Sequence, residues 1–209
     1  MLFQLTILPN GAKIGIWKMQ EKEEQLKSLL CEESITDNRF QSIKNEVRKL
    51  EWLCTRVLLK ELCGEEKKIC YNEWGKPNLE DNSFKISISH TKNYVAVMIH
   101  PSLELGIDIE KKSDRVLKLK EKFMSDNELK SINTDQQTIH VLLHWAAKES
   151  LFKILPESEI DFIQHLHIQA FNLAEKGSFD AYETRSGNEQ KFTMHYEISD
   201  DFVLTWTTK

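Results

Sequence analysis

The chain has 209 residues, of which 40% are hydrophobic and 29% are charged. This composition is ordinary for a soluble globular protein, and the length allows one sizeable domain or two small ones. The formal net charge of -5 supplies no overall basic field, which argues against nucleic acid as a general partner. Residues 1–5 lack the features of a signal peptide, and no apolar run approaches the roughly 20 residues that span a bilayer. We therefore expect a cytoplasmic protein with no membrane partner.

The cysteines do not indicate a metal or redox site. Cys31, Cys54, Cys63 and Cys70 show no C-x-x-C pairing, and in the cytoplasm they should stay reduced. Cys54 lies within an apolar stretch of helical spacing, so we expect it to be a small core residue.

The first half of the chain mixes strand and helix patterns. Apolar residues alternate in some segments and recur at helical spacing in others, with turn residues between them. We expect, in chain order, a hairpin at 3–17, an amphipathic helix at 21–30, a long helix at 39–62 stopped by Gly64, a turn-rich loop at 72–78 and paired antiparallel strands at 83–90 and 94–99.

A break at Pro101-Ser102 leads into the second half. We expect there a strand at 103–109, a charged helical region to about residue 133, a helix at 138–155 terminated by Pro156, and strands at 166–170, 179–183, 192–198 and 202–207. Each half offers a long helix and several antiparallel-type strands. The pattern predicts two α+β subdomains, 1–101 and 102–209.

The chemistry-bearing residues gather in two segments of the second half. In a strand, Asp108 and Glu110 point to the same face, and in a helix Glu149 and Lys153 stand one turn apart. Carboxylates and lysines from two elements suit a divalent cation that grips a polyphosphate, because hard cations such as Mg²⁺ take oxygen ligands.

Four motifs, in this order, resemble those of the 4′-phosphopantetheinyl transferases of the larger, surfactin-synthetase-activating type. They are Gly75-Lys76-Pro77, Ser87-Ile88-Ser89-His90, Gly106-Ile107-Asp108-Ile109-Glu110 and Trp145-Ala146-Ala147-Lys148-Glu149-Ser150-Leu151-Phe152-Lys153. The resemblance implies a monomeric pseudo-dimer of two similar α+β halves, each a long helix packed on an antiparallel sheet, with the active site at their interface. It also implies transfer of the phosphopantetheine arm of coenzyme A to a serine of an apo acyl or peptidyl carrier protein, releasing adenosine 3′,5′-bisphosphate.

The resemblance also assigns roles to individual residues. Asp108, Glu110 and Glu149 would hold Mg²⁺, and Glu149, directly or through a metal-bound water, would take the serine proton while Lys153 reaches the phosphates. The residues expected to contact coenzyme A are Lys76, Ser89, His90, Lys148, Lys153 and, for the adenosine 3′-phosphate, Arg39, Lys44 and Arg48.

Other interpretations stay open at this point. The chain could be a non-catalytic coenzyme A or nucleotide-binding protein, or a divalent-metal pyrophosphohydrolase. Trp145 is expected to be a core residue that walls the metal site. His140 and His144 have the spacing of a zinc site, without a third ligand nearby.

The expected surface for the carrier protein is a basic segment with apolar residues after it. Lys118 and Lys120 would steer an acidic carrier, and Phe123 and Met124 would supply apolar contact, unless Phe123 belongs to the core and the lysines form a solvated helix face. The pathway that the carrier serves is open.

Overall fold

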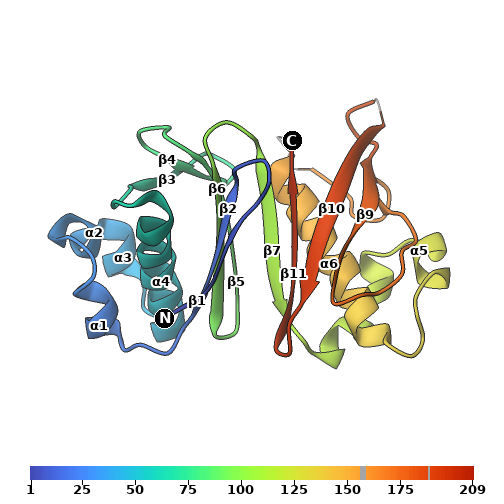
Figure 1. The fold of residues 1–209 in the computed structure, drawn as a ribbon, viewed down its shortest axis with the longest axis horizontal. Helices are drawn as coiled ribbons and strands as arrows, with labels where there is room; N and C mark the ends of the chain where they lie inside the picture. Colours follow the sequence, from blue (N-terminus) through green and yellow to red (C-terminus); the bar gives the residue numbers. More distant parts are fainter. Residues whose placement is uncertain (156–158, 188) are drawn as a thin grey trace. The chain divides into compact units, whose positions relative to one another are not determined.

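The computed structural model describes residues 1–155, 159–187 and 189–209. Two compact units make up the chain, Met1–Leu103 (unit 1) and Glu104–Lys209 (unit 2). Both units combine helices with antiparallel sheets, so the predicted α+β class is confirmed (Figure 1).

Unit 1 contains a four-stranded antiparallel sheet in the order β1-β2-β6-β5. The expected hairpin and the expected strand pair are both present, with slightly different ends. The four strands are β1 (Leu2–Ile7), β2 (Lys13–Lys18), β5 (Lys85–Thr91) and β6 (Tyr94–His100). Gly11 and Asn93 adopt positive φ angles of 86° and 72° in the two turns, a conformation that glycine and asparagine tolerate best.

The long helix predicted at 39–62 is wrong in its first part, because the chain forms two helices there. Asn45 adopts an extended backbone and its Oδ1 accepts the Arg48 N–H at 3.1 Å, so a new helix begins after it. Gly64 ends this helix in the left-handed conformation, as predicted. The remaining elements of unit 1 are α1 (Glu23–Lys27), α2 (Glu32–Thr36), α3 (Asn38–Ser42), α4 (Glu46–Cys63), β3 (Ile69–Tyr71) and β4 (Pro77–Leu79).

Helix α4 packs on the sheet of unit 1 and forms its core. Leu53, Val57 and Leu58 are buried, and Cys54 lies among them as predicted. All four cysteines are free thiols, and Cys31 and Cys70 are exposed. Burial raises the pKa of the Cys54 thiol to about 12.

Unit 2 contains a five-stranded antiparallel sheet in the order β7-β11-β10-β9-β8. The predicted strands are all present with shifted ends, and helix α6 (Gln137–Ile154) packs against β7 and β11. The expected helix terminator Pro156 lies outside the described residues. The strands are β7 (Leu105–Lys111), β8 (Leu166–Ile168), β9 (Lys176–Glu183), β10 (Gln190–Ile198) and β11 (Phe202–Thr208).

The charged region between β7 and α6 forms short pieces rather than one helix. Its elements are the 3₁₀ turns η1 (Asp114–Lys118) and η2 (Lys120–Lys122) and the helix α5 (Asp126–Lys130). Ser125 and Glu128 form a reciprocal capping box that begins α5. No helix in the described part of the chain combines the length and the apolar character that crossing a membrane requires.

Candidate active site

Strand β7 and helix α6 approach unusually closely in unit 2. A Cβ atom on Gly106 would lie 2.0 Å from the backbone oxygen of Ser150, so only glycine fits this position of the strand. The Ser150 hydroxyl in turn lies 2.8 Å from the Thr205 hydroxyl of β11. Since Ser150 follows Glu149, these two contacts fix the carboxylate-bearing turn of α6 against β7, the strand that carries Asp108, and against the neighbouring β11.

Asp108 and Lys153 form an ion pair between β7 and α6. The Lys153 Nζ donates to Asp108 Oδ1 at 2.7 Å and to the Ile107 carbonyl oxygen at 2.8 Å. Asp108 is 4% exposed. The structure therefore brings together an aspartate and a lysine that the sequence predicts for the same site.

Glu110 is held by the indole of Trp145. The Trp145 Nε1–H donates to Glu110 Oε1 at 2.8 Å, and the indole ring packs edge-on against Phe123 with ring centroids 5.1 Å apart. Trp145 is packed against the core of unit 2 while it bonds this carboxylate.

The three carboxylates influence one another's ionisation. Burial, and then the charge of Asp108, raise the pKa of Glu110 to about 7, and Glu149 adds to the effect. Burial and the charge of Asp108 also raise the pKa of Glu149. Lys153 opposes both shifts without cancelling them, so the site carries an excess of negative charge that a divalent cation would relieve.

The donor set suits Mg²⁺, although the side chains do not form a coordination sphere. Within residues 1–155, 159–187 and 189–209, no three His, Cys, Asp or Glu side chains are grouped so that they could hold a metal ion. Asp108, Glu110 and Glu149 nevertheless offer only carboxylate oxygens, which are the ligands that Mg²⁺ prefers. The chemistry of these donors and their mutual repulsion both fit a hard divalent cation.

Lys148 has a different environment from the one that the sequence suggests. Its side chain is completely buried, and Nζ donates to the Phe123 oxygen at 2.7 Å, to Glu128 Oε2 at 2.8 Å and to the Phe162 oxygen at 2.8 Å. An ammonium has three N–H donors, and all three are used within the protein. Lys148 therefore has no N–H left for a coenzyme A phosphate, and we leave it out of the proposed binding site.

The carboxylate that pairs with Lys148 organises the same region. Glu128 Oε2 accepts the Ser125 N–H at 2.7 Å, and Oε1 accepts the Ile168 N–H at 2.8 Å. The Ser-x-x-Glu spacing is a recognisable capping signal, although the sequence does not reveal that Lys148 completes the pair.

In unit 1, Arg48 of α4 and His90 of β5 lie together. The Arg48 Nη1 is 3.1 Å from His90 Nε2, so two residues that the sequence predicts as coenzyme A contacts share one place. Glu51, which the sequence analysis missed, accepts a hydrogen bond from Arg48 Nη1 at 2.9 Å. Its position three residues after Arg48 is visible in the sequence, but its proximity to His90 is not.

The other predicted contacts of unit 1 lie elsewhere on its surface or in its interior. The Arg39 guanidinium lies over the Tyr71 ring, 4.8 Å from its centroid, and Lys44 is exposed. Ser89 is buried on β5. Lys76 lies in a tight turn in which Asn72 Oδ1 accepts the Lys76 N–H at 2.8 Å.

The apolar part of the predicted carrier surface is wrong. Phe123 and Met124 are each 2% exposed and belong to the core of unit 2, because they pack beneath α6. Leu119 is instead the exposed apolar side chain of this segment, and it stands between Lys118 and Lys120.

The histidines of α6 do not form a zinc site. The His140 Nδ1 accepts the Asn133 N–H at 2.8 Å, so we assign its proton to Nε2. The His144 Nδ1 lies 2.9 Å from the His140 carbonyl oxygen and must donate to it. A metal on Nε2 of His140 would force a proton onto Nδ1, where the Asn133 N–H already points.

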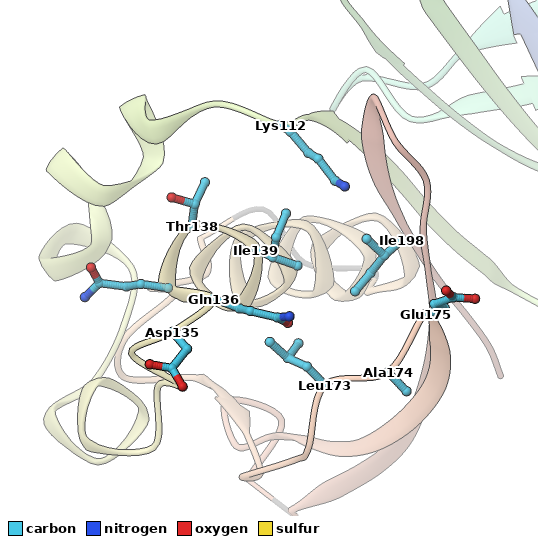
Figure 2. Close-up of a pocket in the computed structure, with 10 residues that line it drawn as sticks. Lys112, Asp135, Gln136, Thr138, Ile139, Leu173, Ala174, Glu175 and Ile198 are labelled. Carbon is cyan, nitrogen blue, oxygen red and sulfur yellow. The ribbon is translucent and has the colours of Figure 1, made fainter.

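A cavity of about 500 Å³ lies at the N-terminal end of α6 (Figure 2). Ile139, Leu173 and Ile198 provide apolar lining, and the Lys112 side chain points toward its interior. None of the predicted catalytic or metal-binding residues lines this cavity.

Comparison with known proteins gives a consistent result for the segment that carries the site. The family model described as the 4′-phosphopantetheinyl transferase superfamily matches residues 104–207. A protein of Aneurinibacillus migulanus named 4′-phosphopantetheinyl transferase gsp is 32% identical over 126 residues, which cover 56% of this chain and 52% of that protein. The chain thus spans about half the length of this relative.

A second relative is shorter. The holo-[acyl-carrier-protein] synthase of Staphylococcus haemolyticus (strain JCSC1435) is 34% identical over 90 residues, which cover 36% of this chain and 74% of that protein. The matched family model, the two relatives and the motifs on β7 and α6 agree, and the chain belongs to the 4′-phosphopantetheinyl transferase superfamily.

Proposed function

We propose that this protein transfers the 4′-phosphopantetheine group of coenzyme A to a serine of an apo acyl or peptidyl carrier protein. The observation that carries the proposal is the Asp108–Lys153 ion pair beside Glu110 and Glu149, on the segment that matches the family model. The two units, each with an 18-residue helix on an antiparallel sheet, suit the two similar halves that the resemblance implies. We also propose that the enzyme acts in the cytoplasm as a monomer.

In this proposal, Asp108, Glu110 and Glu149 hold Mg²⁺. When bound, the ion would neutralise charge on the pyrophosphate of coenzyme A. Burial raises the pKa of Glu110 and Glu149, and the charge of Asp108 adds to this; a bound cation would relieve that repulsion.

The protein's own residues then position the reactants and move one proton. The serine Oγ of the carrier attacks the β-phosphorus, a new O–P bond forms, and the pyrophosphate P–O bond breaks to release adenosine 3′,5′-bisphosphate. Glu149 takes the serine proton, directly or through a water. Lys153, whose ammonium reaches the Asp108 carboxylate from α6, stabilises the charge that develops on the leaving phosphate.

Unit 1 supplies contacts to the nucleotide end of coenzyme A in this proposal. Arg48 and His90, 3.1 Å apart, would bind phosphate, and Lys76, Ser89, Arg39 and Lys44 are further proposed contacts. On unit 2, the basic segment around the exposed Leu119 would receive the acidic carrier.

The test is a transfer assay on purified protein with coenzyme A, Mg²⁺ and an apo carrier. Wild-type protein should add the mass of phosphopantetheine to the carrier, and excess chelator should abolish the reaction. Asp108→Asn should lower kcat by at least about a hundredfold, because one carboxylate charge is removed from the metal site and from Lys153. The matched control Asp180→Asn, a half-buried aspartate paired with Lys191, should retain activity.

Three other outcomes would contradict the proposal or one of its assignments. Coenzyme A cleavage without any mass gain on a panel of apo carriers would indicate a pyrophosphohydrolase. Binding of coenzyme A without turnover would indicate a non-catalytic binding protein. Near-normal kcat in a folded Asp108→Asn variant would exclude the assigned metal site.

A further inference from the structure

Glu51 contacts both Arg48 and His90 in unit 1, and the sequence analysis did not predict it there. Its Oε2 accepts a hydrogen bond from Arg48 Nη1 at 2.9 Å, and its Oε1 faces His90 Nδ1 at 3.6 Å. The Glu51 side chain is 12% exposed, whereas Arg48 is 61% and His90 is 39% exposed. The carboxylate therefore lies beneath two more exposed side chains, one from a helix and one from a strand.

The hydrogen-bond geometry fixes which ring nitrogen carries the proton. A guanidinium can only donate, so His90 Nε2 accepts from Arg48 and the proton of the neutral ring is on Nδ1, toward Glu51. Both ring nitrogens of His90 therefore face partners within the protein, Nε2 toward Arg48 and Nδ1 toward Glu51. Arg48 keeps its other N–H groups, so the guanidinium can donate to a ligand without losing either contact.

We propose that Glu51 is a positioning residue that aligns Arg48, with His90 as a second support, for one phosphate group of coenzyme A. This inference rests on the proposed function. A guanidinium donates to a phosphate through N–H groups that lie in one fixed plane, so its orientation decides how well it binds. Glu51 and His90 both contact Nη1 and leave the other N–H groups of Arg48 for the ligand.

The chemistry of coenzyme A identifies the phosphate. Two of its three phosphorus atoms belong to the pyrophosphate, which the proposed function assigns to Asp108, Glu110, Glu149 and Lys153. The phosphate left for Arg48 is the 3′-phosphate of the ribose, which the sequence resemblance also implies for this residue and which is a terminal dianion that an exposed guanidinium can reach.

The test compares the binding of two ligands that differ only in this group. Calorimetry should be done without carrier, with coenzyme A and with 3′-dephospho-coenzyme A, on wild type and on Glu51→Gln. We expect Glu51→Gln to weaken coenzyme A binding about tenfold and to change 3′-dephospho-coenzyme A binding by less than about twofold. In the transfer assay, KM for coenzyme A should rise while kcat stays the same, because the contact is made equally in the ground state and the transition state.

Two variants serve as controls. Glu61→Gln, an exposed glutamate on the same helix, removes the same charge and should change neither ligand's affinity. Arg48→Gln, at an exposed position, should reproduce the selective loss of coenzyme A affinity, and Glu51→Gln should have little further effect in that background. Arg48→Gln also keeps the test available if Glu51→Gln does not fold.

The possible failures are distinguishable. Unchanged or tighter coenzyme A binding by folded Glu51→Gln would overturn the positioning role, and an equal loss for both ligands would overturn the assignment to the 3′-phosphate. If wild-type protein binds neither ligand, the proposed function itself has failed.

Discussion

At the scale of single residues, the buried histidines of α6 make stability depend on pH. His144 is completely buried, and burial lowers its pKa from 6.5 to about 4. The unfolded chain therefore binds a proton between pH 6.5 and 4 that the folded chain rejects. The contribution of His144 is fully present above pH 6.5 and is lost as the pH falls toward 4.

We expect this loss to reach about 3 kcal/mol in the free energy of unfolding. Urea titrations at pH 7.5 and 4.5 should measure it, and His144→Leu should show a smaller difference between the two pH values. Some dependence should remain in that variant because burial also lowers the pKa of His140. Equal pH dependence in wild type and His144→Leu would rule out this role.

A second residue-scale prediction concerns the buried pair of Lys148 and Glu128. Lys148→Met should lower the free energy of unfolding by about 3–5 kcal/mol, because the Glu128 carboxylate would stay buried without its ammonium partner. Adding Glu128→Gln should recover part of this loss, since the amide carries no charge. A Lys148→Met protein whose urea midpoint matches the wild type would contradict this prediction.

At the scale of elements, the contact between β7 and α6 decides whether the carboxylates meet. Gly106→Ala should lower the free energy of unfolding by about 3 kcal/mol, because the new Cβ would overlap the backbone oxygen of Ser150. It should also reduce kcat, since Asp108 and Glu149 would move apart.

Gly15→Ala is the matched comparison for this prediction. The new Cβ of Gly15 would lie 2.7 Å from Leu58 Cδ1, the end of a flexible side chain that can shift. Thermal melting and kcat should therefore change less than in Gly106→Ala. A larger effect of Gly15→Ala would show that the backbone contact at Ser150 is not limiting.

Elements with a strong periodic pattern were predictable, and breaks caused by single polar residues were not. Alternation predicted the strands of both sheets, and Gly64 correctly predicted the end of α4. Apolar spacing continued through residue 43 and hid the N-cap at Asn45, where side-chain bonding to the backbone ends the helical pattern. The same competition at Ser113 and Ser125 divided the charged region into short turns.

At the scale of the whole molecule, we expect carrier docking to depend on the distribution of charge more than on the net charge. The chain carries a net charge of -5, so an acidic carrier would be repelled on average. The segment with Lys118, Leu119 and Lys120 would have to supply the local attraction.

Lys118→Glu combined with Lys120→Glu should raise KM for the carrier by about tenfold at low ionic strength and by less at high salt, with KM for coenzyme A unchanged. Lys176→Glu with Lys191→Glu makes the same charge change on β9 and β10 and should have a smaller effect. If carrier KM at low salt is the same in all three proteins, docking takes place on another surface.

The candidate site was predictable where its residues share a local motif, and not where folding brings distant residues together. Spacing alone placed Asp108 with Glu110 and Glu149 with Lys153. The burial of Lys148 by carbonyl groups of Phe123 and Phe162, and the approach of Glu51 to His90, depend on tertiary packing that no local pattern records. Phe123 and Met124 were misplaced for the same reason.

The distribution of cysteines has a practical consequence for following the unfolding of the chain. All four thiols lie in unit 1, and residues 104–209 contain none. Cys54 is buried against the sheet by α4, so an alkylating reagent can reach it only when that helix separates from the sheet. Pulsed alkylation read by mass spectrometry would therefore report the opening of unit 1 alone.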